Sequence, residues 1–410
     1  MTAAVSPLAP TAVPELPPLA GVRLASHACG IRYRDRTDLL FVEMVPGTTA
    51  AGVFTRSLTC SAPVDWSRAA AAGGRARALV VNSGNANAFT GRAGEDAVRT
   101  TAEATAAVVG CDPAEVFIAS TGTIGVPLDA SKITGALPPL RERLRDEAWA
   151  EAARAIMTTD TYPKCATRTA TIDGVPVRLN GIAKGSGMIA PDMATMLGFV
   201  FTDAALPAPV LRALLTRGAD RSFNAITVDS DTSTSDTLCL FATGQAPHQP
   251  VSDPGDARLV GFRRALDGLL LDLAHLVVRD GEGASKFVTI TVTGAASPRA
   301  ARRIGLAIAN SPLVKTAIAG EDANWGRVVM AVGKSGEKAD RDRLRIAIGG
   351  TLVAEAGGAV PGYDETPVVT HMKGHDIVIE VDVGVGRGRA TVWTCDLTHA
   401  YIDINGAYRT

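Results

Sequence analysis

The stretch Gly181-Ile-Ala-Lys-Gly-Ser-Gly-Met-Ile-Ala-Pro-Asp-Met-Ala-Thr-Met-Leu-Gly-Phe199 decides how the rest of the sequence is interpreted. It begins as a glycine-rich loop that carries one cation, Lys184, and Pro191 then fixes φ and removes a backbone donor. The apolar run that follows contains a single hydroxyl, Thr195, and resembles a buried strand. Taken alone, the pattern favours a loop leading into a core strand, with Thr195 a β-forming residue among apolar neighbours. The alternative is a nucleophile held in an apolar pocket beside a lysine.

The composition is that of a close-packed protein with many tight turns. The 410 residues include 41 glycines, and 46% are apolar although only 5% are aromatic, which favours an α/β or α+β fold with about two or three domains. A formal net charge of −1 provides no basic surface for nucleic acid. Since no uncharged apolar run of about 20 residues occurs, we expect no membrane span.

The N-terminus and the scattered cysteines and histidines carry little functional signal. Residues 1–20 contain five prolines and no basic residue, which argues against a signal peptide and predicts a disordered leader. The six cysteines include no Cys-x-x-Cys pair, which favours free thiols in a reducing cytoplasm. His371 and His375 lie four residues apart, but the intervening Gly374 and the absence of a glutamate favour two exposed histidines in a turn, so we expect no metal site.

Two predicted strands end in clusters of small polar residues. Residues 75–81 run into Asn82-Ser-Gly-Asn-Ala-Asn87, which is either a turn or the wall of a polar pocket. Residues 116–125 end in Ser120-Thr-Gly-Thr-Ile-Gly125, a turn that can aim backbone N–H groups and a hydroxyl at one point, as an oxyanion requires, although ordinary structural turns of this kind are commoner. Residues 223–237 contain three aspartates but lack the glycine and distal glutamate of a calcium loop, so we expect a hydrogen-bonded framework there.

Periodicity and turn residues predict the remaining elements. The alanine-rich segment 94–109 should be a helix that ends at Gly110, and a second helical region, 131–156, should break at Pro138-Pro139. A polar loop is expected over residues 320–327. Further helices are expected over 208–217, 258–278 and 298–311, and strands over 39–45, 166–179 (a hairpin), 287–292, 344–353, 377–383 and 389–393.

Several stretches together resemble one family. Lys184-Gly-Ser-Gly-Met-Ile-Ala-Pro-Asp-Met-Ala-Thr-Met-Leu197 resembles the signature of the glutamate N-acetyltransferase family, also called the ornithine acetyltransferase family. The resemblance covers about residues 20–410. Only Ser235 and Gly406-Ala407 depart from the family's usual pattern. The other motifs match in the same order: Asn82–Asn87, Ser120–Gly125, Thr158–Thr161 with Pro163-Lys164, Asp229–Thr234, Asp280–Gly283, Asn324–Arg327 and the end from Tyr401 to Thr410.

The resemblance implies a precursor that cleaves itself between Ala194 and Thr195. Residues 21–194 would form an alpha chain behind the leader. Residues 195–410 would form a beta chain that begins with the nucleophile and includes a smaller α/β domain from about residue 250. The implied fold class is α+β, a layered α/β sandwich similar to that of self-processing N-terminal-threonine hydrolases. The implied assembly is a cytoplasmic heterotetramer of two alpha and two beta chains.

The resemblance also implies the reaction. The acetyl group of N-acetyl-L-ornithine passes to L-glutamate through an acetyl-Thr195 intermediate, and the free α-amine of Thr195, with an ordinary pKa of about 7.7–8.0, serves as the base for its own hydroxyl. Thr121 and Gly122 would form the oxyanion hole. No cofactor is implied, and acetyl-CoA is a second donor in bifunctional members. The positions that match the family's substrate contacts are Thr161, Lys184, Thr195, Glu282, Asn405 and Thr410.

Two other interpretations compete with this one. An N-terminal-threonine aminopeptidase or amidase of similar fold would use the same nucleophile, but the matches at Lys184 and Glu282 disfavour it. A non-catalytic scaffold would have no need of Thr195, Thr121 and Gly122. Because Thr121, Gly122 and Glu282 accompany it, the stretch 181–199 is better interpreted as both a maturation site and an active site than as a simple core strand.

Overall fold

The structure is a computed structural model, and it describes residues 4–32, 36–190 and 196–407. The chain divides by packing into two units. The larger is formed mainly by Pro10–Asn224 and Thr232–Val277, and the smaller by Met1–Ala9, Ala225–Asp231 and Val278–Tyr408. Both combine β-sheets with covering helices, which confirms the expected α+β class with layered sheets and helices. None of the described helices has the length and apolar composition needed to cross a bilayer.

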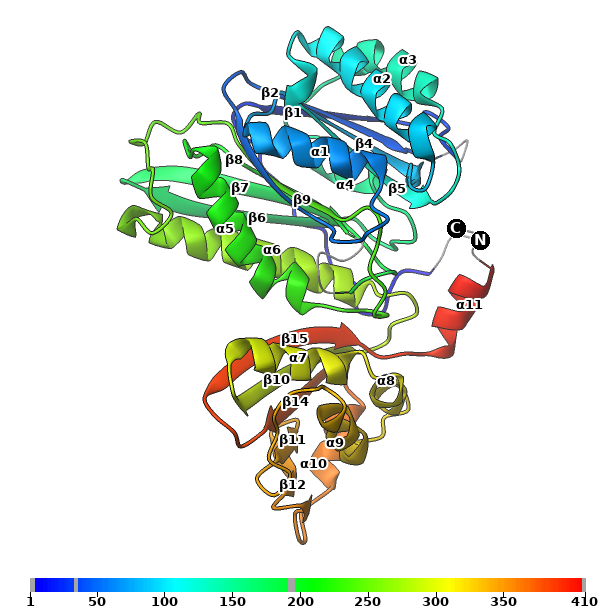
Figure 1. Cartoon of the computed structure of the whole chain (residues 1–410), viewed down its shortest axis with the longest axis vertical. Helices are drawn as coiled ribbons and strands as arrows, with labels where there is room; N and C mark the ends of the chain where they lie inside the picture. The colour runs from blue at the N-terminus through cyan, green and yellow to red at the C-terminus, as the bar shows by residue number, and fades with distance from the viewer. Residues whose placement is uncertain (1–3, 33–35, 191–195, 408–410) are drawn as a thin grey trace. The chain divides into compact units, whose positions relative to one another are not determined.

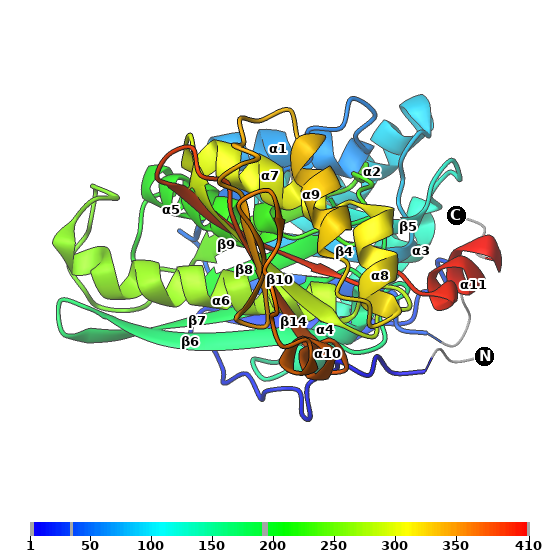
Figure 2. The same cartoon turned by 90° about the horizontal axis from the view of Figure 1, so that it is seen from below.

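Two sheets stack face to face in the larger unit (Figure 1). The first sheet has the order β1-β2-β4-β5, in which only β4 and β5 are parallel, and the second has the order β3-β9-β8-β7-β6, in which only β9 and β8 are parallel. Figure 2 shows β6 and β7 as a long hairpin. The strands are β1 (Val22–His27), β2 (Leu39–Met44), β3 (Thr49–Phe54), β4 (Ala78–Asn85), β5 (Val116–Thr123), β6 (Lys164–Ile172), β7 (Val175–Lys184), β8 (Leu197–Thr202) and β9 (Thr237–Ala242).

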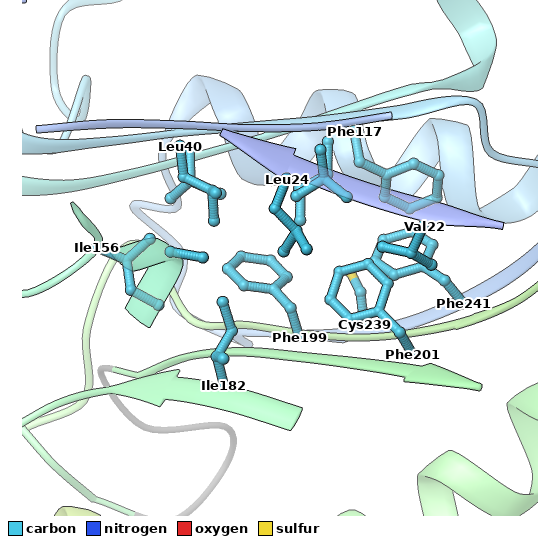
Figure 3. Packing of buried hydrophobic residues seen from close by; sticks show 14 of the residues in the cluster. Val22, Leu24, Leu40, Phe117, Ile156, Ile182, Phe199, Phe201, Cys239 and Phe241 are labelled. Atoms are coloured by element: carbon cyan, nitrogen blue, oxygen red, sulfur yellow. The ribbon is translucent and has the colours of Figure 1, made fainter. Parts of the chain in front are cut away.

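The alternation of side chains along each strand explains the layers. In β4, Leu79 and Val81 face the second sheet, whereas Ala78 and Val80 belong to the core beneath the covering helices, as a period of two requires. Figure 3 shows aromatic and aliphatic side chains of both sheets pointing toward one another in the gap. Phe117 of the first sheet and Phe241 of the second meet edge to face, with ring centroids 5.1 Å apart. Apolar burial on both faces therefore fixes both the stacking and the strand register.

Helices α2 and α3 cover the outer face of the first sheet, and α5 and α6 cover that of the second (Figure 1). Helix α2 ends as predicted at Gly110, whose φ of 78° is left-handed. The predicted break at Pro138-Pro139 is wrong, because both prolines lie inside α3 and the helix ends only at Arg141. Leu137 and Leu140, which flank the prolines, are buried. The packing of their side chains stabilises the helix by more than the loss of the backbone hydrogen bonds at the prolines destabilises it. The helices are α1 (Ala62–Gly73), α2 (Gly91–Val109), α3 (Ala130–Arg141), α4 (Trp149–Ala155), α5 (Ala208–Arg221) and α6 (Val260–Arg279).

The described part of the N-terminal leader is packed, which corrects the expectation of disorder over residues 1–20. Leu16 and Leu19 are buried in the core between the two sheets. Asn180 Nδ2 donates a hydrogen bond to the Pro17 carbonyl at 2.7 Å, and Thr243 Oγ1 donates to the Ala20 carbonyl at 2.7 Å. The prolines lack N–H groups, but their carbonyls still accept hydrogen bonds, and the interspersed leucines supply apolar surface to bury.

The smaller unit consists of one sheet covered by helices. Its strand order is β13-β12-β11-β14-β10-β15, and the only parallel pair among these strands is β10 with β14. The expected loop over 320–327 is partly wrong, because a helix already begins at Trp325, where the Asn324 side chain caps it by accepting from the Arg327 N–H. The elements are β10 (Phe287–Ala295), α7 (Pro298–Ala309), α8 (Pro312–Ala319), α9 (Trp325–Gly333), β11 (Arg345–Ile348), β12 (Thr351–Glu355), β13 (Gly358–Ala359), α10 (Thr366–Met372), β14 (Asp376–Asp382), β15 (Gly388–Cys395) and α11 (His399–Ala407).

Candidate active site

One end of the second sheet lies beside the carboxyl end of β5. Lys184, the last residue of β7, pairs with Leu197, which in turn pairs with Thr237, so β7 ends where β8 and β9 begin. The Lys184 side chain is buried, and its Nζ donates a hydrogen bond to Thr121 Oγ1 of β5 at 3.1 Å. The fold thus brings together two of the residues that the sequence singled out, from strands of two different sheets.

This contact has a direct chemical consequence for the Thr121 hydroxyl. Because its oxygen accepts from the Lys184 ammonium, the hydroxyl keeps its own proton as a donor. A buried cation behind that donor strengthens it toward an anion, since charge interactions are stronger in a low-dielectric environment. The pair is therefore suited to stabilise negative charge that develops on a carbonyl oxygen.

The asparagine-rich segment behind Thr121 is the end of β4, and it is tied to the neighbouring strand by side-chain amides. Ser120 Oγ donates to Asn82 Oδ1 at 2.6 Å, Asn82 Nδ2 donates to the Asn85 carbonyl at 2.9 Å, and Asn85 Nδ2 donates to the Val126 carbonyl at 3.0 Å. These side chains are buried. Of the two interpretations left open, the segment is therefore closer to a polar wall than to an exposed turn.

Gly122 occupies a backbone position that no other residue could take without movement. Its φ is 130°, and an added Cβ would lie 2.3 Å from the Gly84 carbonyl carbon of β4. The close approach of β4 to β5 at this point fixes the peptide that follows Thr121.

Replacing Gly122 by alanine should lower the free energy of unfolding by about 3 kcal/mol or more. The positive φ is strained for a residue that has a Cβ, and the new Cβ would also overlap the backbone of β4 at Gly84. Gly125→Ala is the matched control, since Gly125 also has a left-handed φ of 80° but nothing lies within 4 Å of an added Cβ. That control should cost about 1–2 kcal/mol. Urea unfolding of both variants measures the difference, and equal losses would contradict this explanation of Gly122.

A buried ion pair supports the segment that follows Lys184. Asp160 Oδ1 accepts hydrogen bonds from Lys164 Nζ at 2.6 Å and from the Gly185 N–H at 2.7 Å, and Oδ2 accepts from the Thr158 N–H at 2.9 Å. The Asp160 and Lys164 side chains are fully buried. Burial by itself would raise the pKa of Asp160, but the charges of Lys164 and Lys184 together with these hydrogen bonds hold the pKa well below its usual range. Asp160 is therefore a carboxylate that fixes the backbone at Gly185.

Sequence reasoning missed this supporting role of Asp160 and Lys164. Both lie in a matched motif, but nothing in the local sequence shows that the Asp160 carboxylate reaches the Gly185 N–H. The adjacent Thr161 is half-buried. The cleavage residues Ala194 and Thr195 and the C-terminal Thr410 lie outside the described residues.

Two further predicted residues contact each other in the smaller unit. Asn405 of α11 donates from Nδ2 to Glu282 Oε2 at 2.7 Å. The turn that carries Glu282 is held against the start of α11, because Thr398 Oγ1 donates to the Gly283 carbonyl at 2.7 Å and a Cβ on Gly283 would lie 2.6 Å from the Tyr401 nitrogen. Helix α11 is therefore docked against the turn that carries Glu282.

The described residues contain no cluster of three or more histidine, cysteine or acidic side chains placed to hold a metal ion. The prediction of two exposed histidines in a turn is wrong for His371, which lies in α10 and is half-buried. Its Nε2 accepts from the Val378 N–H at 2.9 Å, and burial lowers its pKa, so it acts as a neutral structural acceptor.

Comparison with known proteins identifies the family. The family model described as "ArgJ family" matches residues 23–410. The arginine biosynthesis bifunctional protein ArgJ of Gluconobacter oxydans (strain 621H) is 62% identical over 99% of this chain and 96% of its own length. The protein of the same name from Rhizobium meliloti (strain 1021) is 61% identical over the whole of both chains. A solved ornithine acetyltransferase from Mycobacterium tuberculosis, in complex with ornithine, is 38% identical, with a TM-score of 0.38 over 42% of this chain and 92% of that chain. With a family model matched over almost its full length, the chain belongs to the ArgJ family.

Proposed function

We propose that the protein is an acyltransferase of arginine biosynthesis that transfers the acetyl group of N-acetyl-L-ornithine to L-glutamate. Membership of the ArgJ family carries the proposal, because the match spans residues 23–410 and so includes every motif of the candidate site. The relatives are named bifunctional, which supports acetyl-CoA as a second acetyl donor for glutamate.

Maturation would precede the acetyl transfer. The Thr195 Oγ attacks the carbonyl carbon of Ala194, and the bond from that carbon to the Thr195 nitrogen breaks. The hydroxyl group loses its proton in this step, and the nitrogen gains one. Water then hydrolyses the resulting ester, which leaves a carboxylate at Ala194 and a free hydroxyl and α-amine at Thr195. The products are residues 1–194 and 195–410.

The transfer itself would follow a ping-pong cycle. The α-amine of Thr195 removes the proton of its own hydroxyl, which attacks the acetyl carbonyl of N-acetyl-L-ornithine. Ornithine leaves with a proton on its α-nitrogen, and an acetyl ester remains on Thr195. The amine of L-glutamate attacks this ester, and N-acetyl-L-glutamate leaves while the proton returns to the hydroxyl. Each half-reaction passes through a tetrahedral oxyanion.

The described residues fit the polar demands of this cycle. We assign Thr121 and Gly122 to the oxyanion, with the Lys184 ammonium strengthening the Thr121 hydroxyl as a donor and also attracting the substrate carboxylate. Glu282, held by Asn405, provides a carboxylate for a substrate ammonium. Thr161 and Thr410 are proposed as further substrate contacts.

The remaining assignments of the proposal follow from the same family. We propose a cytoplasmic heterotetramer of two alpha and two beta chains that needs no cofactor and binds no nucleic acid. The competing activity is an N-terminal-threonine aminopeptidase or amidase. Purified protein should form N-acetyl-L-glutamate from N-acetyl-L-ornithine and L-glutamate, and in a separate reaction from acetyl-CoA and L-glutamate. Peptide hydrolysis without acetyl transfer would contradict the proposal and favour the competing activity.

Replacing Thr121 by valine should lower kcat by about 10²–10³-fold, because the change removes one oxyanion donor while keeping the shape of the side chain. Thr121→Ser keeps the hydroxyl and is the matched control, expected to retain most of the activity. Initial rates of acetyl transfer, measured on protein that a denaturing gel shows to be fully cleaved, separate the two variants. A Thr121→Val enzyme with unchanged kcat would exclude Thr121 from the oxyanion hole.

A further inference from the structure

A cavity of about 930 Å³ lies in the larger unit. From the side of the first sheet, its wall is formed by residues 18–22 of the leader and the start of β1, the end of β2, Arg77 just before β4, and the turn at residues 144–147. Arg178 of β7 and Asp203, which follows β8, line it from the second sheet. Both sheets therefore contribute to one hollow with room for a small molecule.

The cavity lies at the opposite end of the first sheet from Thr121. Arg77 directly precedes Ala78, the first residue of β4, whereas Thr121 is paired with Ser83 near the end of that strand. A strand rises about 3.3 Å per residue, so Ala78 and Ser83 are roughly 17 Å apart. A ligand in the cavity would therefore occupy a site distinct from the proposed oxyanion hole.

Part of the charge around the cavity is already paired. Arg23 Nη2 contacts Glu43 Oε2 at 2.9 Å. Arg145 contacts Glu147 of the cavity at 3.5 Å and Glu151, which does not line the cavity, at 2.7 Å. Once these ion pairs are set aside, the charged side chains that remain in the wall are two arginines and two aspartates.

The two remaining arginines present N–H groups to the cavity. Arg77 Nε donates to the Met44 carbonyl at 2.9 Å, and Arg178 Nη1 donates to the Pro18 carbonyl. Among the described residues, neither Nη of Arg77 nor Nη2 of Arg178 has a hydrogen-bond or ion-pair partner. The bonds to backbone carbonyls fix the two guanidinium groups and leave donors for an anion, and a carboxylate is the anion whose shape a guanidinium fits best in bidentate contact.

The two remaining aspartates supply the opposite charge. Asp203 is half-buried, and its Oδ1 accepts from the Arg178 N–H at 2.8 Å, whereas its Oδ2 has no hydrogen-bond partner in the described part of the chain. Asp146 is exposed, and its carboxylate likewise has no partner there. The cavity therefore offers acceptors for two cationic groups as well as donors for one carboxylate.

We propose that this cavity binds a free dibasic amino acid, which carries one carboxylate and two cationic groups. Its carboxylate meets Arg77 and Arg178, and its α-ammonium meets Asp203, which the backbone hydrogen bond holds next to Arg178. The side-chain cation extends to Asp146 at the exposed side. L-Ornithine, which leaves in the cycle proposed above, and L-arginine are the two sources of this chemistry.

Isothermal titration calorimetry on the purified, unmodified protein tests the inference with L-arginine and L-ornithine as separate ligands. Saturable binding is expected, and the amino acid with the lower Kd at this site is its occupant. Agmatine lacks the carboxylate of L-arginine, and L-citrulline has a neutral side chain of nearly the same shape. Each analogue should bind at least about 10-fold more weakly than L-arginine, because it leaves charged groups of the cavity without a partner. An analogue that binds as tightly as L-arginine would overturn the inference.

Two variants locate the binding in the cavity. Asp203→Asn keeps the oxygen that accepts from the Arg178 N–H but removes the charge, and Arg77→Gln removes the guanidinium group. Each should raise the Kd of the bound amino acid by about 10-fold or more. Asp253→Asn is the matched control, because Asp253 also accepts from a backbone N–H, that of Gly255 at 2.7 Å, but does not line the cavity. This control should leave the Kd unchanged.

The outcomes separate this site from the proposed function. Unchanged affinity in both Asp203→Asn and Arg77→Gln would overturn the inference, because the amino acid would then bind elsewhere, as at the active site. The absence of saturable binding by both amino acids to the unmodified protein would overturn it as well. Binding is measured without acetyl transfer, so a protein that binds the amino acid through Asp203 but forms no N-acetyl-L-glutamate would refute only the proposed function.

Discussion

Replacing Thr195 by alanine should leave the protein as one uncleaved chain that transfers no acetyl group. Both steps need the same hydroxyl, because it attacks the Ala194 carbonyl during maturation and the acetyl carbonyl during catalysis. Without cleavage, no free α-amine exists to act as the base. We therefore expect the largest effect of any single substitution, with acetyl transfer at the detection limit and a single band at the full 42.4 kDa on a denaturing gel.

Thr195→Ser is the matched control for this change. It keeps a hydroxyl at the same position, so it should still cleave and transfer acetyl groups, at a rate lowered by the looser rotamer of a side chain that lacks the branching methyl group. Acetyl transfer that survives in Thr195→Ala would refute the covalent mechanism, whatever the gel shows.

The second large effect is expected at Asp160. Asp160→Asn removes the carboxylate that accepts from the fully buried Lys164 ammonium at 2.6 Å, and breaking a buried ion pair by removing one partner typically costs about 3–5 kcal/mol. The double variant Asp160→Asn/Lys164→Met removes both charges and should recover part of this loss. Urea unfolding in the uncleaved Thr195→Ala chain measures the free energies on one continuous chain. If the double variant is no more stable than Asp160→Asn alone, the ion pair is not what stabilises this segment.

The depressed pKa of Asp160 also sets the direction of its pH dependence. A carboxyl group whose pKa is lower in the folded state stabilises the fold at any pH above its unfolded pKa of about 3.9. That stabilisation is lost as the pH falls below this value toward the depressed folded pKa. The difference in stability between the unmodified chain and Asp160→Asn should accordingly be full at neutral pH and shrink below about pH 4.

Local patterns predicted much of the framework. The strand predicted over residues 75–81 is present as β4 (Ala78–Asn85), and the alanine-rich helix α2 and its end at Gly110 follow from residue types close together in the sequence. The prediction failed where long-range packing decided the outcome. Leu16 and Leu19 order the proline-rich leader by entering a core formed by distant strands, and the packing of Leu137 and Leu140 carries α3 through two prolines.

The residues of the candidate site were likewise only partly predictable from the sequence. Thr121 and Lys184 were identified through the family resemblance, and the structure adds that they share a hydrogen bond. Asp160 was not identified, because its role depends on the pairing of β6 with β7. That pairing places its carboxyl group beside the Gly185 N–H, which lies 25 residues away along the chain. A sequence motif shows that such a residue matters, but not which backbone group it holds.

The acetyl-Thr195 intermediate is tested most directly by the intact mass of the purified protein after incubation with N-acetyl-L-ornithine alone. Before incubation, two chains should be present with the masses of residues 1–194 and 195–410. Incubation should add the mass of one acetyl group to the second chain only, with Thr195 as the modified residue in its peptides, and L-glutamate should remove it. A single chain of 410 residues, or a second chain that never gains an acetyl group, would contradict the proposed mechanism.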